Sequence, residues 1–251
     1  MNHVDVPVTL QLLFADLHRA ARVRVVLAQP GGSGLHAEVE RVQAASVAWA
    51  RGCGLVAAAQ VERLARARIA WLPARAYPRG DVEALQIAAD WTTLFCLLDD
   101  HIEGEASPEA VGRELEGLLA MFEPGARAGA GALQRACVDL RERVAAYGRE
   151  RLGRFAARVR ELFAAFVVEA QGRAEGVIPG LAAYVPLREQ TVGLHVEFEL
   201  GELVDGVVLT AAERASAGRV ELARLASELV GWANDIYTHE KELRAGETHT
   251  L

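Results

Sequence analysis

One short stretch, Asn-Asp-Ile-Tyr-Thr-His-Glu-Lys-Glu at residues 234–242, decides how the whole sequence is interpreted. Asn234, Thr238 and Glu242 lie four residues apart, so a helix places them along one side over about 12 Å. Their amide, hydroxyl and carboxylate oxygens are hard donors that suit a hard divalent cation. A charged amphipathic helix is the simpler interpretation. It does not explain why the chain's only lysine, Lys241, and one of its two asparagines both fall here.

The helix around this stretch has two further faces. One is apolar and lies nearly opposite the three oxygen donors, so we expect it to contact the core. Its residues are Leu222, Leu225, Leu229, Trp232 and Ile236. The other face is polar and is formed by Arg224, Glu228, Asp235 and His239. We therefore expect Asp235 and His239 to point to solvent, although both lie inside the stretch.

A second acidic group follows an apolar stripe in the middle of the chain, at Asp99, Asp100 and Glu103. Asp99 and Glu103 share one helical face with Phe95. Carboxylates at the C-terminal end of a helix are unfavourable, because that end already carries partial negative charge. A cation is therefore expected here, and Mg²⁺ fits because it binds through one or two carboxylates. A solvated acidic helix end is the alternative.

The remaining sequence predicts an all-α fold. Gly- and Pro-containing turns separate Ala- and Leu-rich segments without period-2 alternation. The expected helices cover residues 36–52, 55–71, 81–103, 108–121, 130–146, 148–174, 181–208 and 211–244. Glycines interrupt the segment 181–208, where we expect either a kink that serves a site or close helix packing. We expect residues 1–34 to be a loosely structured segment and residues 35–251 to be one helical domain.

The composition limits the partners and the location. A net charge of -7 argues against a nucleic-acid partner, which would favour a basic face. The three cysteines have no ligand-like spacing and are expected to be free thiols in a reducing cytosol. The N-terminus lacks the pattern of a signal peptide, and no stretch approaches the roughly 20 apolar residues that span a bilayer. We expect a cytoplasmic protein that does not bind membranes.

Together the two acidic stretches resemble the motifs of the bacterial class I terpene synthases, or terpene cyclases. The aspartate-rich motif of that family, DDxx(D/E), matches residues 99–103, and its motif ND(L/I/V)x(S/T)xxKE matches residues 234–242 at every defined position. The family places an arginine 46 residues before the motif's asparagine, which is Arg188 here. A helix break follows that arginine, so the resemblance gives Gly193 a carbonyl that faces the substrate. A linear prenyl-chain synthase would instead carry two aspartate-rich motifs.

The resemblance implies a class I terpenoid synthase helical bundle that ionises and cyclises a linear isoprenyl diphosphate, geranyl or farnesyl diphosphate, and releases diphosphate. Three Mg²⁺ ions are implied, with ligands among Asp99, Asp100, Glu103, Asn234, Thr238 and Glu242. The implied phosphate donors are Arg188 and Lys241. The implied substrate pocket contains Phe95, Gly193, Trp91 and Phe198, with Trp232 as a further candidate. For each aromatic residue, plain core packing is an equal alternative, although an aromatic face can stabilise a carbocation.

The resemblance covers residues 35–251, and members of the family continue beyond the second motif with helices that carry an Arg-Tyr pair. We therefore expect a bundle that lacks the C-terminal helices. The rival hypothesis is a truncated, non-catalytic homologue that binds metal and diphosphate without turnover. An unclosed bundle exposes apolar surface, so a homodimer is a further expectation.

Overall fold

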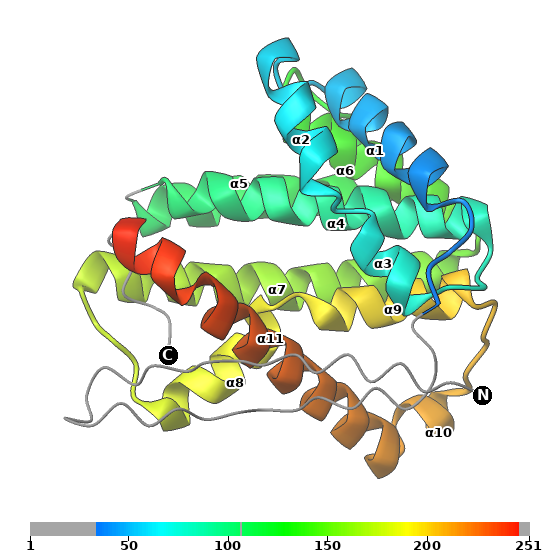
Figure 1. The fold of residues 1–251 in the computed structure, drawn as a ribbon. Coiled ribbons are helices and arrows are strands. Elements are labelled where there is room, and N and C mark those ends of the chain that lie inside the picture. The colour runs from blue at the N-terminus through cyan, green and yellow to red at the C-terminus, as the bar shows by residue number, and fades with distance from the viewer. Residues whose placement is uncertain (1–33, 106, 246–251) are drawn as a thin grey trace, which may run out of the picture. The chain divides into compact units, whose positions relative to one another are not determined.

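The computed structural model describes residues 34–105 and 107–245, except for the side chains of residues 239–245 (Figure 1). It contains helices and no strand within that part of the chain. The chain divides into two compact units, Met1–Gly34 and Leu35–Leu251, and nearly all of the first lies outside the described residues. The all-α fold predicted from the sequence is confirmed. None of the described helices is long and apolar enough to cross a membrane.

The second unit is a succession of antiparallel and crossing helices (Figure 1). The α-helices are α1 (Val39–Cys53), α2 (Val61–Ala67), α3 (Trp71–Ala76), α4 (Val82–Glu103), α5 (Pro108–Leu119), α6 (Ala132–Ala145), α7 (Arg149–Glu175), α8 (Leu181–Thr191), α9 (Leu194–Val204), α10 (Ala211–Arg214) and α11 (Ala217–Ala245). Two 3-10 turns, η1 (Ala58–Gln60) and η2 (Ala120–Phe122), precede α2 and follow α5.

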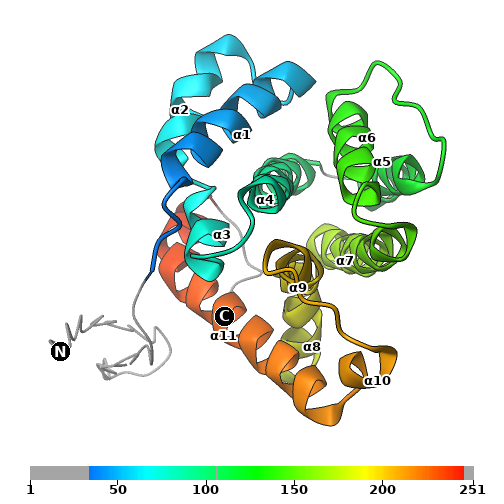
Figure 2. The same cartoon turned by 90° about the vertical axis from the view of Figure 1, so that its right-hand side faces the viewer.

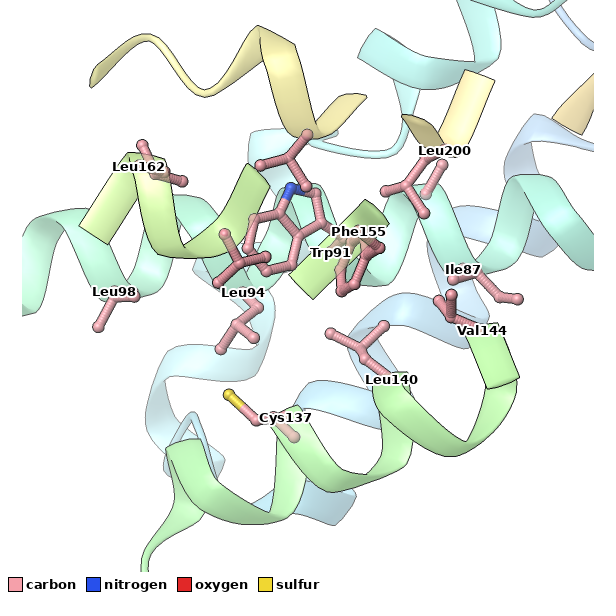
Figure 3. Packing of buried hydrophobic residues seen from close by; sticks show 14 of the residues in the cluster. Ile87, Trp91, Leu94, Leu98, Cys137, Leu140, Val144, Phe155, Leu162 and Leu200 are labelled. Carbon is pink, nitrogen blue, oxygen red and sulfur yellow. The ribbon is translucent and has the colours of Figure 1, made fainter. Parts of the chain in front are cut away.

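Helix α4 is the centre of the unit, with α1, α3, α6 and α9 packed against it (Figure 2). Its start is fixed by Asp81, whose carboxylate accepts a hydrogen bond of 2.9 Å from the N–H of Ala84. The buried side of α4 packs into a continuous apolar core (Figure 3). There Trp91, 1% exposed, meets the ring of Phe155 on α7 edge to face at 5.2 Å.

Three of the expected helices are interrupted. The segment 55–71 breaks at Arg68, which has a left-handed φ of 53°, and the N–H of Ala70 donates to Gln43 of α1 instead of continuing the helix. The segment 181–208 breaks at Gly193, so the predicted kink is confirmed. The segment 211–244 divides into α10 and α11 at residues 215–216, and the Thr210–Glu213 capping box fixes the start of α10.

The prediction that the apolar stripe of α11 contacts the core is wrong. Leu222 is 69% exposed, Leu225 46%, Leu229 55% and Trp232 38%. The face packed against α8 and α9 instead carries Ser227, Glu228, Gly231 and Asp235, all of them buried. Asp235 is buried there through an ion pair and hydrogen bonds with α8, whereas Glu228 pairs with Arg224 of α11 itself.

Candidate functional site

Arg188 on α8 is the residue that brings the two ends of the candidate site together. Its Nη2 donates to the amide Oδ1 of Asn234 on α11 at 2.8 Å, across 46 residues of sequence. The same guanidinium donates from Nε to Asp235 Oδ1 at 2.9 Å, and Nη2 lies 2.8 Å from that oxygen. The structure therefore places Arg188 against the start of the 234–242 stretch.

Asp235 is buried, which contradicts the expectation that it points to solvent. It is 3% exposed, and its second oxygen, Oδ2, accepts a short hydrogen bond from the hydroxyl of Tyr184 on α8. Burial and this interaction with Asp235 raise the pKa of Tyr184. The prediction was wrong because it assumed that a carboxylate on a polar helical face is solvated by water. Here Arg188 and Tyr184 take the place of water as the hydrogen-bond donors to Asp235.

Carboxylates from two helices meet at the C-terminal end of α4. Burial, reinforced by the nearby Glu169 carboxylate, raises the pKa of Asp99 to about 7, while Arg188 and Arg173 partly oppose the shift. Burial also raises the pKa of Glu169, a residue of α7. Carboxyl groups are thus brought together where the sequence predicted that a cation would be needed, and their raised pKa values reflect the cost of ionising them there without one.

Glu169 is a residue that the sequence interpretation missed. It follows Leu162 and Phe166 at helical spacing on α7, so an apolar stripe runs into a carboxylate there just as Phe95 leads to Asp99 on α4. The rings of Phe95 and Phe166 stack at 6.1 Å between centroids, about one turn before the two carboxylates. The same signal that singled out Asp99 was therefore present on α7.

The donor set fits Mg²⁺, although no three His, Cys, Asp or Glu side chains among the described residues converge closely enough to hold an ion by themselves. Mg²⁺ typically uses one or two carboxylates and takes its other oxygens from water and phosphate. On α11, Thr238 spends its hydroxyl proton on the backbone carbonyl of Asn234 at 2.9 Å, so its oxygen lone pairs stay available. Asp100 and Glu103 are exposed at the end of α4.

The break between α8 and α9 is built around a close contact with α4. Gly193 has φ of 77°, and a Cβ at this position would lie 2.8 Å from Cε2 of Phe95. Only glycine satisfies both the backbone and the ring. The structure thus joins Phe95 and Gly193, which the sequence had placed in one substrate pocket.

The other aromatic candidates differ in their surroundings. Trp91 packs in the core against Phe155, as described above, so the structure lends no support to it as a pocket wall. Phe198 is half-buried and meets the ring of His195 edge to face at 6.0 Å. Trp232 lies on the exposed stripe of α11. Lys241 and Glu242 fall in the last turns of α11, where the side chains lie outside the described residues.

Comparison with known proteins identifies the family. The family model for terpene synthase family 2, C-terminal metal binding, matches residues 90–251. The chain is 34% identical over 189 residues to a protein of Roseiflexus castenholzii named (+)-T-muurolol synthase ((2E,6E)-farnesyl diphosphate cyclizing). The aligned region covers 72% of this chain and 57% of that protein. It is 32% identical to bonnadiene synthase of Allokutzneria albata, with 70% of this chain and 52% of the relative covered. The chain thus spans about half the length of these curated relatives.

Solved structures agree on the fold. The linalool/nerolidol synthase of Streptomyces clavuligerus in complex with 2-fluorogeranyl diphosphate superimposes with a TM-score of 0.77, covering 90% of this chain and 75% of that chain at 23% identity. At this identity the likeness concerns the fold alone. The family model, by contrast, covers well over half of the sequence and includes both acidic stretches. The chain therefore belongs to the terpene synthase family, as its resemblance to the bacterial class I members predicted.

Proposed function

We propose that this chain carries the diphosphate-ionising site of a terpene cyclase and converts a linear isoprenyl diphosphate to a terpene with release of diphosphate. The observation that carries the proposal is the position of Arg188. It contacts Asn234 on α11 at 2.8 Å and lies close enough to the carboxylates of Asp99 and Glu169 to shift their pKa values. One cationic side chain thus lies between the two oxygen-rich helices.

Geranyl or farnesyl diphosphate is the proposed substrate. The Roseiflexus castenholzii relative is named as cyclising (2E,6E)-farnesyl diphosphate, and the Streptomyces clavuligerus structure holds a fluorinated geranyl diphosphate. Both ligands join an apolar chain to a dianionic or more highly charged head. The described site offers the matching pair of environments, with stacked Phe95 and Phe166 beside charged residues at the ends of α4 and α7.

Three Mg²⁺ ions are proposed as cofactors. The proposed ligands are Asp99 with Asp100 or Glu103 at the end of α4, and Asn234, Thr238 and Glu242 on α11. Bound Mg²⁺ supplies the positive charge that stabilises diphosphate as it leaves.

The chain's own groups act on the two halves of the substrate. Arg188 and Lys241 donate hydrogen bonds to phosphate oxygens and thereby stabilise the charge that develops when the carbon–oxygen bond breaks. Phe95 presents an aromatic ring on the apolar side, where it stabilises the allylic cation and excludes water. Gly193 permits that ring to lie against the α8–α9 break and has a proposed carbonyl contact with the substrate. Phe198 is proposed as a further wall of the pocket.

We also propose that the exposed stripe of α11 binds a second copy of the chain. Leu222, Leu225, Leu229 and Trp232 follow one another at intervals of three and four residues, the spacing with which two helices pack side by side. Val220, Val230 and Tyr237 extend the exposed apolar surface of the same helix. A surface of this kind favours association.

Product analysis tests the proposed activity. The purified chain is incubated with geranyl, farnesyl or geranylgeranyl diphosphate and Mg²⁺, and the organic extract is analysed by gas chromatography and mass spectrometry. We expect hydrocarbon or alcohol products that disappear with EDTA and in the Asp99→Ala, Asn234→Ala double variant. Glu116→Ala, at an exposed position of α5, is the matched control and should keep the activity.

Two negative outcomes have different meanings. A folded chain that binds Mg²⁺ and diphosphate but forms no product is the non-catalytic homologue. A folded chain that binds neither overturns the proposed function altogether.

A further inference from the structure

Two sets of oxygen acceptors surround Arg188, one on α11 and one on α4 and α7. On the α11 side are Asp235 and the amide of Asn234, both within hydrogen-bonding distance of the guanidinium. On the side of α4 and α7 are the carboxylates of Asp99 and Glu169, which feel the charge of Arg188 although no direct contact joins them. Arg188 therefore interacts electrostatically with acids of both sets, but only the α11 side holds it by direct contacts.

Asp235 contacts Arg188 on the α11 side and is itself held in place. Its Oδ1 accepts a hydrogen bond of 2.9 Å from Nε of Arg188 and lies 2.8 Å from Nη2 in the ion pair, so it faces the Nε–Nη2 edge of the planar guanidinium. Its Oδ2 is held by the hydroxyl of Tyr184, which is itself only 7% exposed. A carboxylate fixed at both oxygens leaves the arginine little freedom to turn.

The other edge of the guanidinium stays available. Within the described residues, Nη1 has a single long contact of 3.5 Å, to the hydroxyl of Thr191. An arginine held by one edge in this way can still donate two N–H groups to an anion. Gly231 of α11 keeps this arrangement close to the helix, because a Cβ there would lie 3.3 Å from Cγ of Arg188.

We propose that Asp235, supported by Tyr184, is a positioning residue that holds one edge of Arg188 on α11, so that the other edge serves the diphosphate and the carboxylate of Asp99 on α4 is left to bind metal. This inference rests on the proposed function. Without Asp235, Arg188 turns to Glu169 and Asp99. The phosphate donor is then misplaced, and the metal carboxylates are neutralised.

The energetics of burial agree with such a role. A buried ion pair costs desolvation that its mutual attraction only partly repays, so apolar residues at these positions stabilise a fold at least as well. The ion pair of Asp235 with Arg188 lies beside the proposed metal ligand Asn234, because Nη2 of Arg188 is 2.8 Å from Oδ1 of each of these two residues.

Calorimetric binding of inorganic diphosphate in the presence of Mg²⁺ tests the inference with the full chain. Asp235→Asn keeps the size of the side chain and removes its charge, and we expect it to weaken binding by about tenfold, the scale of a hydrogen bond to a charged group. In an Arg188→Ala background the same change should add less than about twofold, because Asp235 acts through Arg188. Glu228→Gln is the matched control. It alters another acid–arginine pair of α11, between buried Glu228 and half-exposed Arg224, and should lower the melting temperature without changing diphosphate affinity.

Tyr184→Phe keeps the test decisive if Asp235→Asn does not fold. It removes only the support of Oδ2 and should weaken binding by about threefold, again only while Arg188 is present. Failure of the unmodified chain to bind Mg²⁺ and diphosphate overturns the proposed function and this inference with it. Normal binding by the unmodified chain, combined with unchanged or tighter binding in the folded Asp235→Asn or Tyr184→Phe variant, overturns the inference alone. Losses that add fully to that of Arg188→Ala do the same, because they indicate a merely structural role.

Discussion

Glu197 on α9 offers a test of the electrostatics of the unit that does not depend on catalysis. Its carboxylate contacts Thr92 of α4 at 2.8 Å, and the same Thr92 hydroxyl lies 2.7 Å from the carbonyl of Ala88. A hydroxyl has one proton to donate. When that proton goes to Ala88, Glu197 must carry its own proton to bond with Thr92. Burial favours the same state and raises the pKa of Glu197 to about 7.

The predicted consequence is a loss of stability as the pH rises. An unfolded glutamate titrates near 4.3, so between about pH 4 and pH 7 the folded chain keeps a proton that the unfolded chain has released. The contribution of protonated Glu197 is fully present below the unfolded pKa and disappears as the pH passes through the folded one. Each pKa unit corresponds to about 1.4 kcal/mol, which gives an upper limit of about 4 kcal/mol. Glu197 is half-buried, so solvent screens part of this effect, and we expect its protonation to contribute about 2 kcal/mol to the free energy of unfolding.

Urea unfolding of the unmodified chain and of Glu197→Gln, in EDTA at a series of pH values, measures this contribution. The free energy of unfolding of the variant should gain about 2 kcal/mol on that of the unmodified chain between pH 4 and pH 8. The exposed Glu116→Gln on α5 controls for the general effect of removing a carboxylate, and its difference should stay near zero. A difference for Glu197→Gln that does not change with pH would refute the reasoning.

Three other predictions concern the site and its surroundings. Gly193→Ala should lower stability by about 1–3 kcal/mol in urea unfolding, because the residue has φ of 77° and its Cβ meets Phe95; Phe95→Leu in the same chain should restore part of the loss. Mg²⁺ and inorganic diphosphate at about a hundred times their apparent Kd should stabilise the chain by about 2.7 kcal/mol in thermal melts, and Asn234→Ala or EDTA should abolish the gain. Leu225→Glu should reduce self-association in light scattering, whereas Val168→Glu on α7, at a position that is also exposed, should leave it unchanged.

Local signals were sufficient for the long helices. The range predicted for α4, 81–103, agrees with Val82–Glu103 because Asp81 caps the start and Gly104 follows the last turn, both visible in the sequence. The break of the helix after Arg68 could not be predicted in the same way. It depends on Gln43, which is 27 residues earlier in sequence and accepts the N–H of Ala70. A tertiary hydrogen bond of this kind overrides local propensity.

The faces of α11 show why helical periodicity alone misplaced that helix. The apolar stripe from Leu222 to Trp232 has the spacing of a core contact, and hydropathy offers no means of knowing which neighbour it meets. What fixes the orientation is the ion pair of Asp235 with Arg188, reinforced by Tyr184. These partners are 47 and 51 residues away in sequence, so their pairing is a property of the fold.

Asn234 and Asp235 are adjacent in the sequence but have different surroundings in the fold. Neighbouring residues on a helix are about 100° apart, so Asn234 is exposed while Asp235 is buried in the interface with α8. Arg188 touches both, because Nη2 donates to Asn234 and Nε donates to Asp235. On the proposed function, a metal ion bound through Asn234 Oδ1 would compete with Nη2 for that oxygen, whereas Asp235 would still hold Nε and thereby keep the guanidinium beside the diphosphate.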